Sequence, residues 1–134
     1  MKLLTKSITE QLLRNGMLQD RLAGTDAEPD FFPVVKLFTP DANCTWILTE
    51  LDPADKDIAF GLCDLGMGFP EIGSVSIAEL ESVKGKLGLP VERDFHFAPR
   101  HTISVYASAA RSAGAITECQ AALDKAAADA RADS

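Results

Sequence analysis

The sequence predicts an α+β fold: an antiparallel β-meander of about four or five strands with helices packed on one side and helical N- and C-terminal ends. In the centre of the chain, short segments rich in β-branched, aromatic and other apolar residues alternate with turn-forming Pro, Gly, Asp and Asn. The two ends instead carry apolar residues at helical spacing or long runs of alanine. Because short loops separate the central segments, neighbouring strands are expected to pair antiparallel.

The first helix is expected to begin at a capping box in residues 7–10, where a hydroxyl is followed three residues later by a carboxylate. Leu12 and Leu13 then fall on its apolar face. Asn15-Gly16 is predicted to end this helix, since glycine tolerates the left-handed cap conformation, while Met17, Leu18 and Leu22 could extend a second short turn. Residues 23–33 contain a glycine and two prolines and are predicted to form a surface loop or linker.

Local composition predicts four strands, and alternation of apolar and polar residues predicts a fifth: residues 34–39, 44–51, 58–65, 71–76 and 90–97. The third strand, residues 58–65, is nearly continuous in apolar residues, as expected for a well-buried strand.

Further helices are predicted between and after these strands. Ser76 or Ser74 can cap a helix, with Glu79 at the capping-box position after Ser76, and Gly85 and Gly88 are predicted to end it. Thr102 can begin another helix. The alanine-rich residues 115–130 are strongly helix-prone, and residues 131–134 are predicted to fray. All 134 residues are expected to form a single domain with a core at about 34–112.

The composition also constrains the cellular setting. No apolar run approaches the roughly 20 residues that a membrane span needs. The first residues lack the apolar segment of a signal peptide, so a cytoplasmic protein without membrane contact is expected. Cys44, Cys63 and Cys119 are odd in number and not in CxxC spacing, which indicates reduced, buried thiols.

Charge is distributed unevenly along the chain. Residues 26–81 hold twelve acidic residues against only Lys36 and Lys56, a net charge of −10 where the whole chain carries −7. Such a field repels phosphate backbones and attracts basic surfaces. The expected partner is therefore a protein with a basic surface. Direct nucleic-acid binding is disfavoured, although a local patch of basic residues could support it (Lys84, Lys86, Arg93, Arg100, Arg111).

The glycine-rich residues 64–73 follow a strand but do not match a phosphate-binding loop. Pro70 lacks an amide donor, Glu71 repels anions and no Lys-Ser or Lys-Thr pair follows. Met67 and Phe69 at the tip of this connection are instead candidates for docking to another protein. Together with nearby acids they form the candidate protein-binding set: Asp52, Asp55, Asp57, Asp64, Met67, Phe69 and Glu71.

An enzymatic alternative rests on the same carboxylates. Clustered acids can hold Ca²⁺ or Mg²⁺, although the spacing does not fit an EF-hand loop. A small metal-dependent hydrolase or nuclease could combine them with one of the two histidines (Asp52, Asp55, Asp57 or Asp64 with His96 or His101). No serine elbow or catalytic triad is present in the sequence, so no catalytic residue, metal ligand or cofactor is assigned.

Two long stretches, residues 36–52 and 59–76, resemble a bacterial family known as domain of unknown function number 2958. The resemblance extends over residues 34–107 and includes Asp94, Phe95 and Tyr106. It brings no catalytic residue, cofactor or substrate. It implies small single-domain proteins that are often carried on plasmids and on conjugative or phage-like elements. The leading hypothesis is therefore a non-enzymatic accessory protein of a mobile genetic element. It would act as an inhibitor or adaptor on a basic partner, with DNA mimicry as a special case.

Overall fold

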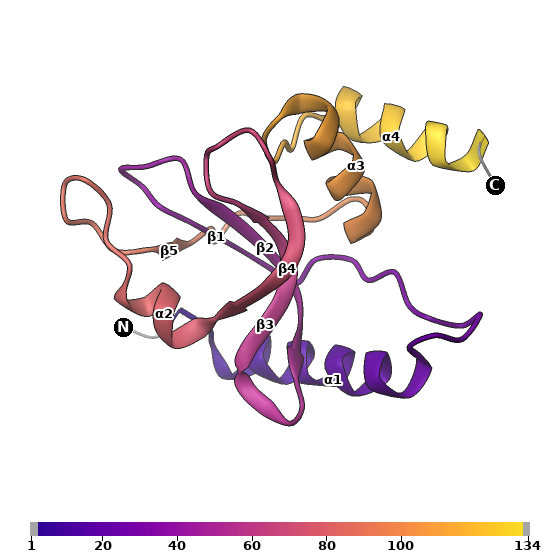
Figure 1. Cartoon of the computed structure of the whole chain (residues 1–134), viewed down its shortest axis with the longest axis horizontal. Helices are drawn as coiled ribbons and strands as arrows, with labels where there is room; N and C mark the ends of the chain where they lie inside the picture. The colour runs from indigo at the N-terminus through magenta and orange to yellow at the C-terminus, as the bar shows by residue number, and fades with distance from the viewer. Residues whose placement is uncertain (1–2, 133–134) are drawn as a thin grey trace.

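The computed structural model describes residues 3–132, which form five strands and four helices (Figure 1). The α+β class, the antiparallel sheet and the helical segments at both ends are confirmed. Within this range no helix has both the length and the apolar character that a membrane crossing needs. The elements are α1 (Lys6–Leu22), β1 (Val35–Phe38), β2 (Thr45–Asp52), β3 (Asp55–Asp64), β4 (Glu71–Ser76), α2 (Ile77–Ser82), β5 (Glu92–Arg93), α3 (Ile103–Ala113) and α4 (Gln120–Ala132).

The sheet has the strand order β4-β3-β2-β1-β5, and each neighbouring pair is antiparallel. Strands β1 to β4 therefore form the predicted meander, and β5 joins the outer side of β1. The strand predicted over residues 90–97 is wrong in extent, since only Glu92 and Arg93 pair with β1. Asp94 ends it by closing a turn: its carboxylate accepts from the His96 amide and its carbonyl from the Phe97 amide.

Strand β2 is buried on both of its faces. On one face, Leu48 packs with Leu12 of α1 and Leu80 of α2 in a first core. On the other face, Ile47 packs with Tyr106 in a second core to which α3 and α4 contribute. The helices thus lie on both faces of the sheet, and the prediction that they pack on one side is wrong.

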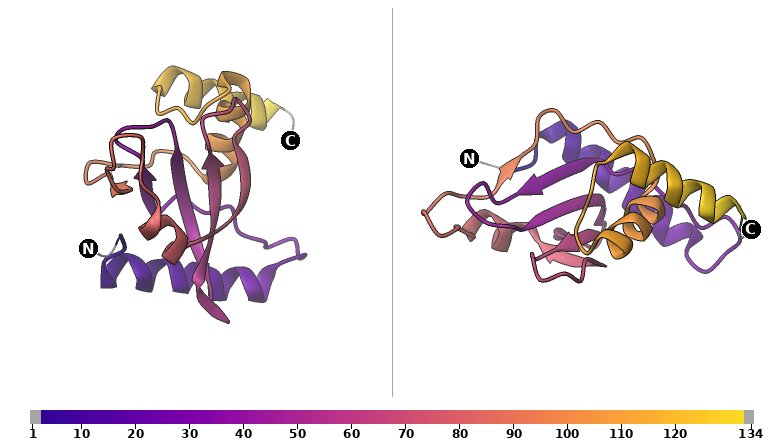
Figure 2. Two further views of the ribbon diagram at one scale, coloured as in Figure 1. Left: turned by 60° about the vertical axis from the view of Figure 1, so that its left-hand side comes forward. Right: turned by 90° about the horizontal axis from the view of Figure 1, so that it is seen from above.

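The physical reason for this second core is the register of the two longest strands. Ile47 lies directly opposite Leu62 of β3, so the two side chains form an apolar spot on the face that would otherwise be polar. That spot needs its own cover, which the C-terminal helices supply. Figures 1 and 2 show α1 and the α3–α4 pair at opposite ends of the molecule, with the sheet between them.

Helix α1 continues through Gly16, where the sequence predicted its end. The Asn15 side chain donates to the Thr49 carbonyl at 2.8 Å, at a point where the β2–β3 register shifts. A Cβ at Gly16 would overlap the carbonyl oxygen of Leu51. Asn15 and Gly16 therefore allow α1 to approach an irregular strand closely. The N-cap of α1 is Thr5, two residues before the predicted cap, and the helix begins at Lys6.

The loop before β1 caps helix α3. Thr102 occupies the N-cap position but makes no side-chain capping bond of its own. Instead the Asp30 carboxylate accepts from the Ser104 amide at 3.1 Å and from the Thr102 hydroxyl at 2.7 Å. The Ile103 amide donates to the Phe31 carbonyl. The segment predicted as a linker thus satisfies amides at the start of a distant helix.

The C-terminal helix begins at Gln120, later than the predicted residue 115. The intervening segment is a loop whose Ile116 amide donates to the Asp64 carboxylate. Buried residues at both ends, including Leu12 and Leu123, extend the core beyond the predicted 34–112. Of the tail predicted to fray, the first two residues are helical and residues 133–134 lie outside the described range.

Two glycines that face each other in the sheet test this packing. Gly61 of β3 pairs with Gly73 of β4. A Cβ at Gly61 would overlap the Ile47 carbonyl oxygen, whereas nothing lies within 4 Å of a Cβ at Gly73. Gly61→Ala should lower the free energy of unfolding by about 1–3 kcal/mol, because overpacking forces backbone shifts. Gly73→Ala is the matched control and should change stability little; urea unfolding of both variants measures the difference. Equal effects would contradict the packing described.

Candidate functional site

The seven candidate binding residues do not share one surface. Strand β3 runs from Asp55 to Asp64, so residues before and after it lie roughly 30 Å apart at the usual rise per residue. The acids of the β2–β3 hairpin lie beside α1, and the loop that carries Met67 and Phe69 lies beside α3 (Figure 1). The structure therefore separates an acidic end from an apolar end.

The hairpin acids shape their own turn. Asp52 and Asp55 face each other across the two-residue connection. The Asp52 carboxylate accepts from the Ala54 amide at 2.9 Å, and the Asp55 carboxylate from the Asp57 amide at 3.1 Å. Both are the local side-chain-to-backbone bonds that make aspartate favourable in turns.

Asp57 joins the hairpin to helix α2. Its carboxylate accepts from the Ser76 hydroxyl and from the Ala78 amide, the latter at 2.8 Å. These two bonds lower the pKa of Asp57 below its ordinary value, since both favour the charged form. The Ser76 hydroxyl in turn accepts from the Glu79 amide, as the sequence predicted for this cap.

Asp64 belongs to the interior. It is 4 % exposed, and its two carboxylate oxygens accept from the Gly66 amide and the Ile116 amide, each at 2.9 Å. It therefore fixes the β3–β4 loop to the segment before α4. A residue so placed cannot contribute to an exposed acidic face.

Most acids of residues 26–81, called here the central acidic block, accept hydrogen bonds from backbone amides. Seven of its twelve carboxylates accept hydrogen bonds from main-chain amides of turns, loops or helix starts. Sequence reasoning could find the local ones near Asp52 but had no signal for the long-range ones. The seven are Asp30, Asp41, Asp52, Asp55, Asp57, Asp64 and Glu81.

The residues proposed for a metal-dependent enzyme are not brought together. The His101 ring pairs with Asp124 of α4 at 3.0 Å. The His96 side chain is exposed, in the turn that Asp94 closes. In the part of the chain that the structure describes, no group of three or more His, Cys, Asp or Glu side chains could hold a metal ion.

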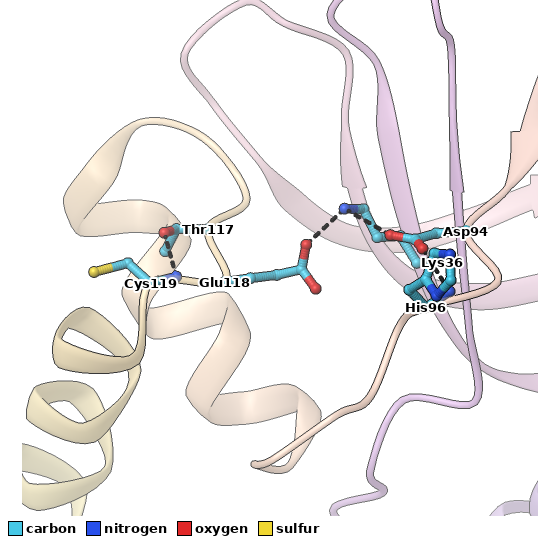
Figure 3. A network of polar contacts seen from close by, with 6 residues as sticks. All are labelled: Lys36, Asp94, His96, Thr117, Glu118 and Cys119. Atoms are coloured by element: carbon cyan, nitrogen blue, oxygen red, sulfur yellow. Dashed lines mark hydrogen bonds and ion pairs between the residues drawn. The ribbon is translucent and has the colours of Figure 1, made fainter.

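A polar network that the sequence did not indicate surrounds Lys36 (Figure 3). Its ammonium lies 2.6 Å from Glu118, in the loop before α4, and 3.4 Å from Asp94, after β5. Burial alone would lower the pKa of Lys36, but the two carboxylates outweigh it and raise the pKa above its ordinary value. Lys36 also lines a cleft of about 470 Å³. Because two carboxylates already neutralise it, the ammonium joins three distant segments rather than offering a free cation.

The β3–β4 loop and the start of β4 expose a cluster of large apolar side chains. Leu65 is 54 %, Met67 70 %, Phe69 81 % and Ile72 55 % exposed. They line a groove of about 370 Å³ together with Trp46 and other residues of the sheet. Exposed apolar side chains gathered around a concave surface are typical of protein-binding sites.

Comparison with known proteins places the chain in a family. A family of proteins of unknown function, DUF2958, matches residues 3–117. The chain belongs to this family. No curated protein and no solved structure matches the chain. The match includes the β3–β4 loop and ends before α4, so helix α4 lies outside the matched range.

The capping role of Asp57 predicts a stability that depends on pH. Its folded-state pKa is lowered, so its contribution is present above the ordinary carboxyl pKa and is lost as the pH falls through the folded value. Asp57→Asn should lower the urea midpoint at pH 7, and the deficit should shrink toward pH 3. Asp55→Asn, on the same hairpin, controls for the loss of one charge. A deficit that is constant with pH would show that charge is not involved.

Glu50 should behave in the opposite way. Burial raises its pKa, the nearby Asp20 and Glu28 carboxylates raise it further, and the Thr49 hydroxyl opposes them. A raised pKa contributes stability below the ordinary carboxyl pKa that is lost as the pH rises through the folded value. Glu50→Gln should therefore raise the urea midpoint at pH 7 and have less effect at pH 4. A lower midpoint at pH 7 would contradict this account.

Proposed function

We propose that the protein is a non-catalytic accessory module that binds another protein through the β3–β4 end of its sheet. The observation that carries this proposal is the exposed apolar cluster around the groove. Each of Leu65, Met67, Phe69 and Ile72 is more than half exposed, and all four line the same concavity. Exposing such side chains forgoes about 25 cal/mol per Å² of apolar area, which a bound partner would recover.

The backbone of this loop is well anchored. Asp64 holds the Gly66 amide at the start of the loop. Gly66 and Gly68 adopt positive φ values of 78° and 86°, which glycine tolerates at no steric cost. Asp64 thus anchors the start of the loop, and the two glycines allow the turns that leave Met67 and Phe69 outside the core.

Charge supports a basic partner. Between Lys56 and Lys84 the chain carries five acids and no base. Of these, Asp64 is buried and Asp57 lies near the far end of β3, whereas Glu71 lines the groove itself. The ion pairs of Lys36, His101 and Lys125 use acids outside the central acidic block, so they do not neutralise it. A field of this sign attracts a basic surface and disfavours direct contact with nucleic acid.

We propose that the protein is an adaptor or inhibitor of a cytoplasmic process, and that its gene is carried by a plasmid or another mobile element. The resemblance described above supports the mobile element. DNA mimicry is less well supported, because many of the acids are turned toward backbone amides at separate places in the fold. No observation favours the metal-dependent hydrolase or nuclease.

A matched pair of double variants tests the proposal. The first variant, Met67→Ser with Phe69→Ser, replaces the two exposed apolar side chains at the tip of the β3–β4 loop. The control, Met17→Ser with Phe32→Ser, replaces two apolar side chains elsewhere that are each 54 % exposed. Immobilised wild-type protein and both variants are incubated with bacterial lysate at low and moderate salt, and retained proteins are identified by mass spectrometry. A basic protein retained by the wild type and the control, lost by the tip variant and weakened by salt, is the expected result. Equal retention by both variants would rule out the tip as the docking surface.

A further inference from the structure

Strand β4 is an unpaired edge of the sheet. It pairs with β3 on one side and, among the described residues, with no strand on the other. In an antiparallel pair, every second residue of the outer strand turns its amide and carbonyl away from the neighbour. Proteins usually block such an edge with lysine, proline or a covering element. Residues 71–76 contain neither lysine nor proline.

The apolar groove lies directly along this edge. Gly73 and Val75 of β4 line it, beside Cys63 of β3 and Trp46 of β2. Trp46 pairs with Cys63, and Cys63 pairs with Glu71, so the groove continues across three strands of the sheet. Nothing lies within 4 Å of a Cβ at Gly73, which leaves the backbone there open to close approach.

The charge of the groove favours a basic segment over a second copy of this acidic chain. Its lining contains Glu71 and no basic side chain. A second copy of the chain would bring another net charge of −7 to the same place, which opposes pairing of two β4 edges. An extended segment with lysine or arginine beside Glu71 is complementary in sign.

We propose that an extended segment of the partner adds to β4 as a sixth strand, with one large apolar side chain in the groove and a lysine or arginine beside Glu71. This inference rests on the proposed protein-binding function and specifies its mode. Main-chain hydrogen bonds to β4 provide affinity, and the groove provides selectivity for alternate side chains. Gly73 leaves room for the apolar side chain to lie across the sheet toward Cys63 and Trp46.

The experiment uses a defined probe in place of the natural partner. The probe is a capped eight-residue peptide of alternating valine and lysine with one central phenylalanine, titrated into ¹⁵N-labelled full-length protein. The expected result is chemical-shift change in the β4 amides and the Trp46 indole. A version that is N-methylated at alternate residues, which cannot pair along its length, should bind at least about tenfold more weakly. A version with glutamate in place of lysine should not bind, and Glu71→Gln should weaken the basic probe whereas Asp55→Asn should not.

Outcomes of this titration and of the lysate experiment are separable. If the N-methylated peptide binds as well as its parent while the groove residues still shift, strand addition is overturned but docking at the tip stands. If no probe perturbs β4 or the groove, this binding mode is overturned, whatever the Met67 and Phe69 variants retain from lysate. If the free protein dimerises with concentration through β4 in analytical ultracentrifugation, the occupant is a second copy and the proposed partner is overturned.

Discussion

The structure depends on burial of β2 from both sides. Ile47 and Leu48 are adjacent in sequence, point to opposite faces and are both fully buried. Each such side chain contributes about 1.5–3 kcal/mol relative to exposure, so neither face can be left open. Helix α1 covers one face from the beginning of the chain, and α3 with α4 covers the other from its end. The sheet cannot bury both of its apolar faces by itself, so the helices at both ends of the chain are part of the fold.

Carboxylates hold several of the connections of this fold. Where a chain turns or a helix starts, backbone amides lack intrahelical or ladder partners and need acceptors. Asp30, Asp41, Asp57 and Asp64 supply them, each across more than ten residues of sequence. A carboxylate keeps its charge when it accepts a hydrogen bond, so the members of this set that reach solvent, such as Asp30, also contribute to the acidic field. Acidity and architecture thus have a common origin.

Local sequence patterns were sufficient to predict part of the fold. Residues 71–76 form the predicted strand and Ser76 caps the predicted helix, because hairpin composition and capping act over a few residues. Contacts between residues far apart in the sequence could not be predicted from such local patterns. Gly16 has the composition of a helix end, yet its partner is the Leu51 backbone, which no local pattern indicates. The contacts of Lys36 with Glu118 and of Asp64 with Ile116 likewise join segments more than fifty residues apart.

In the β3–β4 loop, an anchored start and exposed apolar side chains occur together. Burying the Asp64 carboxylate costs desolvation energy, which its two amide hydrogen bonds offset only if the loop keeps this path. That path holds Met67 and Phe69 outside the core, beside a groove and an unpaired strand edge. A loop selected for stability alone would carry polar residues at these positions, since solvent-facing methionine and phenylalanine add nothing to the interior. Their exposure beside the groove is therefore the feature on which the proposed docking surface rests.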